Sequence, residues 1–130
     1  MLVAGLILAA LAAALHVYIF WMESVAWEGP AARKTFGIGS AEEAKATKPL
    51  AFNQGFYNLF LALLAAGGVI AVAAGARTVG LTLVLAGAGS MLAAALVLLL
   101  SSRQHRAAAI KQGTLPLLAV VFTALGAALA

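Results

Sequence analysis

The chain has 130 residues, of which 65% are hydrophobic and 9% are charged, and its formal net charge is +4. A soluble domain has about a quarter of its residues charged, so this composition excludes an ordinary soluble protein. The absence of cysteine excludes disulfides, thiol nucleophiles and thiolate metal sites. The basic charge does not indicate a nucleic-acid partner, because no basic run has aromatic residues interleaved with it.

Four long stretches contain no Asp, Glu, Lys or Arg: residues 2–22, 49–76, 78–102 and 112–130. Each is close to or longer than the roughly 20 residues that a helix needs to cross the hydrocarbon core. The alternating pattern of an outer-membrane barrel is not visible. The sequence therefore predicts an all-α integral membrane bundle in one domain, residues 1–130. Its four transmembrane helices, in up-down-up-down order, are expected at about 2–23, 50–75, 78–101 and 114–130.

The connection between the first two helices, residues 24–49, is the only sizeable soluble part. A turn is expected at Gly29-Pro30. Ser40 and Glu43 match a capping box, which predicts a short amphipathic helix on the membrane surface. Pro49 fits the first turn of the second spanning helix, where its missing N–H has no cost.

The basic residues predict the orientation. All of them except Arg77 lie in two connections on the same side of the membrane: Arg33, Lys34, Lys45 and Lys48 in the first, and Arg103, Arg106 and Lys111 in the second. The positive-inside rule then places the loops 24–49 and 102–113 in the cytoplasm and both termini outside. We expect Arg103, Arg106 and Lys111 to serve as orientation charges and His105 to be solvated.

The third predicted helix contains Gly80, Gly87, Gly89 and Ser90. Small residues let helices approach closely in lipid. We expect them to build the interior of the bundle, and a homodimer seam is the alternative.

The polar residues of the first two helices gather near the cytoplasmic side. His16 and Glu23 are two helical turns apart and project from nearly the same face. The second helix enters from the same side with an amide-rich segment, residues 53–58. Ionisable groups at this depth are costly unless they have partners, and they indicate a functional site by default. We therefore predict a polar pocket with His16 and Glu23 as candidate catalytic residues. The candidate ligand-binding residues are Tyr18, Trp27, Asn53, Gln54, Tyr57, Asn58 and Arg103.

Structural interpretations of the same residues stay open. Glu23 could be an interfacial carboxylate paired with Arg103 or Lys48, and His16 a neutral ring bonded to a side-chain amide. Asn53 could be a helix cap. The aromatic residues are typical of an interfacial belt: Tyr18, Trp21, Trp27 and Tyr57.

No metal site is predicted, because the histidines and the glutamate lack the spacing of zinc or di-iron helices. Axial haem ligation by His16 is open on chemical grounds alone, and the cofactor, if any, is unknown.

The segments HVYIFWMESVAW, RKTFG and FNQGFYNLFLA resemble the signature of a family of small bacterial four-helix integral membrane proteins, a domain of unknown function numbered in the low thirteen-hundreds. The matching positions are His16, Tyr18, Glu23, Trp27, Pro30, Lys34, Phe36, Gly37, Asn53, Gln54, Gly55, Tyr57 and Asn58. The resemblance implies the four-helix fold and a bacterial inner (plasma) membrane location. It implies no activity.

Three functions are consistent with these observations. The first is binding of a small lipophilic molecule, with proton transfer by His16 and Glu23 as an extension. The second is a homodimeric transporter of small molecules or protons, and the third is an accessory structural subunit. The expected partners are the lipid bilayer, a small lipophilic ligand and, for the transporter, a second copy of the chain.

Overall fold

A computed structural model describes all residues 1–130 and is entirely helical. Its elements are α1 (Leu2–Phe20), the π-helical segment η1 (Trp21–Val25), α2 (Pro30–Phe36), α3 (Ala41–Ala73), α4 (Arg77–Ser101) and α5 (Arg106–Ala128). Four helices are long and apolar enough to cross a membrane: α1 continued by η1, α3, α4 and α5. The predicted all-α bundle of four membrane helices is therefore confirmed.

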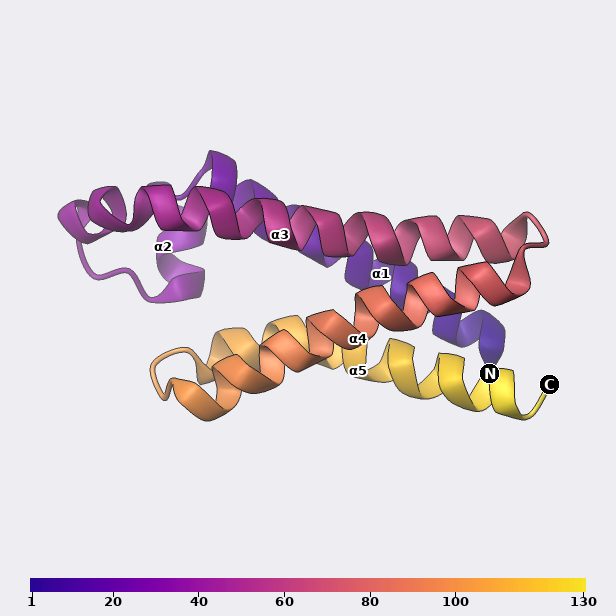
Figure 1. Cartoon of the computed structure of the whole chain (residues 1–130). Coiled ribbons are helices and arrows are strands. Elements are labelled where there is room, and N and C mark those ends of the chain that lie inside the picture. The colour runs from indigo at the N-terminus through magenta and orange to yellow at the C-terminus, as the bar shows by residue number, and fades with distance from the viewer.

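The four long helices pack side by side, with α1 against α3, α3 against α4, α4 against α5 and α5 against α1. Figure 1 shows both chain termini at the same end of the bundle as the tight turn between α3 and α4. The opposite end holds α2 and the loop between α4 and α5. We call these the terminal end and the α2 end.

Small residues hold the helices together, as expected in lipid, where close packing drives association. Two of the three core clusters are built largely from alanines, such as Ala12, Ala65 and Ala88. Between α3 and α4 the backbones nearly touch: a Cβ added to Gly68 would lie 2.7 Å from the carbonyl oxygen of Gly80.

The small residues of α4 do not all face inward. Gly80 and Gly87 are buried in the bundle, as predicted. A Cβ added to Gly89 would have no neighbouring atom within 4 Å, and Ser90 is exposed. Of the four small residues, only Gly89 and Ser90 are therefore placed where they could contribute to a homodimer interface.

The second spanning helix begins earlier than predicted. The capping box does form, because the N–H of Glu43 donates to Ser40 Oγ at 3.1 Å, and Glu43 Oε2 accepts from the N–H of Gly39 at 3.0 Å. The helix that it opens runs without interruption into the membrane span as α3. Pro49 lies inside this helix and is exposed, at a point where water can replace the missing hydrogen bond.

The last helix also begins earlier than residue 114. It starts at Arg106, because the segment that follows is rich in Ala, a strong helix former. The loop that precedes it is consequently short, residues 102–105. This short loop brings Gln104 and His105 close to α2.

Candidate functional site

The site is built around a change of helix geometry at the end of α1. In η1 the N–H of Ala26 donates to the carbonyl of Trp21, five residues earlier, at 2.9 Å. Such wider turns are rare and often occur at functional sites. Glu23 lies in this turn and is only 7% exposed, while His16 in the α-helix before it is 2% exposed. His16 and Glu23 both point into the bundle, as predicted.

Glu23 is held by α3. Asn58 Nδ2 donates a hydrogen bond to Glu23 Oε1, and the same nitrogen lies 3.3 Å from the carbonyl oxygen of Gln54. One residue further along η1, Ser24 Oγ donates to the carbonyl of Phe52 at 2.7 Å. The amide-rich segment of α3 therefore fixes the position of the carboxyl group.

His16 has one ring nitrogen bonded and one free. Its Nδ1 lies 2.9 Å from the carbonyl oxygen of Ala12. A carbonyl oxygen can only accept, so Nδ1 carries the hydrogen and the Nε2 of the neutral ring has a lone pair. The backbone of its own helix fixes this tautomer, and Nε2 has no hydrogen-bond partner in the protein.

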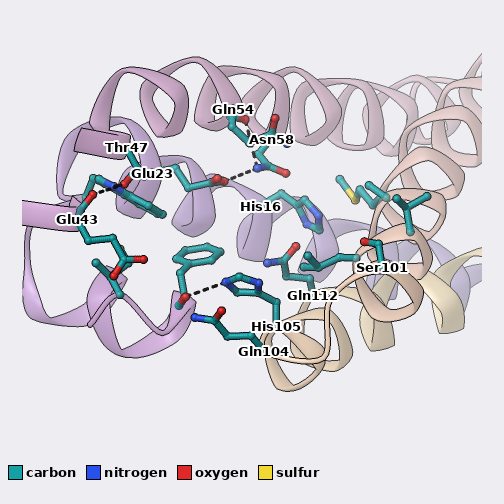
Figure 2. A pocket seen from close by; sticks show the side chains of 17 residues that line it. His16, Glu23, Glu43, Thr47, Gln54, Asn58, Ser101, Gln104, His105 and Gln112 are labelled. Carbon is teal, nitrogen blue, oxygen red and sulfur yellow. Dashed lines mark hydrogen bonds between the residues drawn. The ribbon is translucent and has the colours of Figure 1, made fainter. Parts of the chain in front are cut away.

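These groups border a cavity of about 660 Å³ at the α2 end of the bundle, lined by 17 residues from all the helices (Figure 2). Its polar lining residues are His16, Glu23, Glu43, Thr47, Gln54, Asn58, Ser101, Gln104, His105 and Gln112. Its apolar and aromatic lining residues are Trp27, Phe36, Ile38, Met91, Ala94, Val97 and Leu98.

Hydrogen bonds beside the cavity join the α4–α5 loop to the end of α2. His105 Nε2 donates to the carbonyl of Phe36 at 3.0 Å, and Gln104 Nε2 donates to the carbonyl of Gly37 at 3.3 Å. His105 Nδ1 lies 2.8 Å from the Ser102 hydroxyl, so both of its ring nitrogens are occupied. The expectation that His105 is solvated is therefore wrong, because it joins the α4–α5 loop to the end of α2.

A second contact joins the segment after η1 to α3. Trp27 Nε1 donates to Thr47 Oγ1 at 3.0 Å, and Thr47 in turn donates to the carbonyl of Glu43 at 2.8 Å. The Trp27 ring also lies against Phe36, with 5.3 Å between the ring centroids. Trp27 thus forms part of the wall of the cavity.

The structure brings together five of the residues predicted from the sequence: His16, Glu23, Trp27, Gln54 and Asn58 all line the cavity. The other four do not line the cavity. Asn53 and Tyr57 border a neighbouring open groove that Glu23, Trp27 and Gln54 also line. Tyr18 stacks on Trp21 at the surface, and Arg103 lies in the α4–α5 loop.

Several structural alternatives do not match the contacts. Glu23 forms no ion pair with Arg103 or Lys48, since Lys48 pairs with Glu28 at 2.9 Å. His16 bonds to a backbone carbonyl and not to a side-chain amide. Asn53 does not cap a helix, because it lies in the interior of α3.

Sequence reasoning did not identify the residues that α4 and α5 contribute. Met91, Ala94, Val97 and Leu98 are ordinary residues of an apolar span, and nothing in the sequence separates them from their neighbours. Gln112 did carry a signal, because it is a polar residue in the first half of the last helix. No three His, Asp or Glu side chains lie close enough together to hold a metal ion.

The fold and this site define a helical membrane protein of four spans, with a mixed polar and apolar cavity at one end. The chain belongs to the family described as "Protein of unknown function (DUF1304)", whose sequence model matches residues 10–124. The resemblance noted in the sequence is confirmed as far as a family of unknown function. No curated protein and no solved structure gives a significant match.

Proposed function

We propose that the protein binds a small, largely apolar molecule with one polar group in the cavity at its α2 end. The observation that carries this proposal is His16, which is almost completely buried within a membrane span and yet presents an unbonded Nε2 at the cavity. Because His16 lines the cavity, a ligand hydroxyl or amine could donate a hydrogen bond to Nε2.

The size and lining of the cavity support the same proposal. Its volume of about 660 Å³ falls within the range of small-molecule sites, about 300 to 1,000 Å³. The polar end of the ligand would lie among His16, Glu23 and Asn58, and its apolar body would lie against Met91 and Leu98 of α4. We propose binding without a reaction, because the positions of His16 and Glu23 do not indicate which bond a reaction would form or break.

The basic residues support an orientation for the site. The loops at the α2 end contain every Lys and Arg except Arg77. We therefore propose that this end faces the cytoplasm of a bacterial cell, that both termini lie outside, and that the cavity lies in the cytoplasmic half of the plasma membrane.

Transport is less well supported than binding. The helices at the terminal end pack directly on one another: a Cβ at Gly5 would lie 2.6 Å from the backbone N of Thr123. The buried residues in the middle of the bundle include Ala9, Val84 and Ala119, all fully buried. A carrier needs a polar route through both halves of the membrane, and these contacts offer none.

The proposal is tested by native mass spectrometry of the protein released from its own membrane. We expect an additional small-molecule mass on the wild type and its loss in Ala94→Phe, which fills the cavity from α4. Ala93→Phe is the matched control, because Ala93 is exposed and does not line the cavity. Wild-type protein without any bound mass, or a mass that Ala94→Phe retains, would refute the proposal.

A further inference from the structure

The cavity has a negative character although the protein as a whole is basic. The chain has eight Lys and Arg residues against four Asp and Glu residues. Two of those four carboxyl groups, Glu23 and Glu43, line the cavity, and no Lys or Arg does.

Two acceptors at the cavity wall, on Glu23 and His16, have no partner in the protein, and the unbonded side chains of Gln54, Ser101 and Gln112 can donate as well as accept. Glu23 Oε1 receives the N–H of Asn58, and its second oxygen has no partner in the protein. In the neutral His16 ring, Nε2 presents a lone pair, because Nδ1 holds the single ring hydrogen. A ligand that donates hydrogen bonds would satisfy both acceptors.

The aromatic residues of the wall suit a positive charge as well. Trp27 and Phe36 line the cavity from the same side, with their ring centroids 5.3 Å apart. The faces of such rings attract ammonium groups, Trp most strongly. Neither ring offers a donor to an anion, because the Trp27 N–H is already bonded to Thr47.

We infer, on the basis of the binding function proposed above, that the ligand is a lipophilic amine bound as its ammonium ion. Its N–H groups donate to Glu23 and to His16 Nε2, and its hydrocarbon part lies against the apolar wall of α4. A fatty acid or a phosphorylated lipid would place an anion beside Glu23 with no Lys or Arg in the cavity lining to compensate, so we expect these molecules to bind more weakly.

The test compares three ligands that share one chain and differ in the head group: octylamine, octanol and octanoate. The protein carries Trp21→Phe, so that Trp27 in the cavity wall is the only tryptophan, and is reconstituted in phosphatidylcholine nanodiscs. Trp27 fluorescence reports binding. A charge-assisted hydrogen bond is worth about tenfold in affinity or more, so octylamine should bind at least about tenfold more tightly than octanol and octanoate.

Two substitutions in this background locate the effect. Glu23→Gln keeps an oxygen for Asn58 and removes the negative charge, so the preference for octylamine over octanol should be lost. Glu42→Gln removes a carboxyl group that is exposed and does not line the cavity, and it should leave the preference unchanged. If Glu23→Gln does not fold, the comparison of the three head groups on the protein with Glu23 decides alone.

The outcomes separate the two proposals. If octanol or octanoate binds as tightly as octylamine, the amine inference is overturned and the binding function stands. If octylamine binds equally well to Glu23→Gln, the inference is overturned in the same way. If none of the three alters Trp27 fluorescence, the inference is overturned too, and the mass measurement on Ala94→Phe decides the binding function independently.

Discussion

Gly55 is the residue of the amide-rich segment that we expect to tolerate substitution least. A Cβ at this position would overlap Ser24 Oγ and would lie 3.0 Å from both the Cβ and the backbone N of Ser24. Ser24 cannot move away freely, because its hydroxyl is bonded to the carbonyl of Phe52. Gly55→Ala should therefore push η1 away from α3.

The expected magnitude follows from these contacts. Overpacking of a closely packed interface costs about 1 to 3 kcal/mol, and loss of the Ser24 hydrogen bond costs about 1 kcal/mol. The higher helix propensity of alanine returns about 1 kcal/mol. We expect Gly55→Ala to lower the free energy of unfolding by about 1 to 3 kcal/mol, measured by titrating mixed micelles with dodecyl sulfate and following helical circular dichroism.

Gly67→Ala is the matched control on the same helix. No atom lies within 4 Å of a Cβ at Gly67, so this substitution should stabilise the protein by about 0.5 to 1 kcal/mol. Adding Ser24→Ala to Gly55→Ala should recover part of the lost stability, because it removes the overlapping oxygen. The reasoning fails if Gly55→Ala is as stable as the wild type or gains as much as Gly67→Ala.

Three further predictions concern side chains with defined partners. Asn58→Leu should lower the free energy of unfolding by about 1 to 3 kcal/mol, because it leaves Glu23 without its hydrogen-bond donor. Glu23→Gln keeps an acceptor for Asn58 and should change the free energy of unfolding by less than about 1 kcal/mol. Equal losses for the two variants in dodecyl sulfate titrations would contradict this. Thr123→Val should raise the thermal midpoint or leave it unchanged, because the buried Thr123 hydroxyl has no partner; a clear fall would contradict the structure. The hydrogen bond from Lys48 and the positive charge of Lys48 lower the pKa of the Glu28 carboxyl. The wild type should therefore be more stable than Glu28→Gln by its full margin above the ordinary glutamate pKa, and this margin should disappear as the pH falls through the lowered pKa. A margin that persists in acid would rule out the ion pair as its cause.

The fold could be predicted from the sequence because a membrane span is encoded in length and composition alone. The four charge-free stretches of the sequence correspond to the four apolar helices. The start of α3 could not be predicted, because Pro49 is compatible both with the first turn of a helix and with an exposed position inside one. The η1 turn could not be predicted either, because a hydrogen bond to the fifth preceding residue has no characteristic amino acid.

The sequence predicts in which half of the membrane the site residues lie, but not on which side of its helix each side chain projects. His16, Glu23 and Asn58 were expected in the same half of the membrane, and they line one cavity. Tyr18 and Tyr57 were expected in that half as well, and both are exposed. A helix that is apolar on every side has no stripe to show which face is inward, so the packing of η1 and α3 decides which polar residues meet.

The contacts between η1 and α3 also separate a structural role from a chemical one. Two consecutive residues of η1 meet α3 one helical turn apart: Ser24 lies against Gly55, and Glu23 is bonded to Asn58. Ser24 and Gly55 do not line the cavity, whereas Glu23 and Asn58 do. If the polar residues only stabilised the bundle, substitutions at both pairs would reduce stability and change nothing else. A binding protein should instead lose stability with Gly55→Ala and lose its ligand with Ala94→Phe, which fills the cavity. The two substitutions together distinguish an accessory subunit from a binding protein.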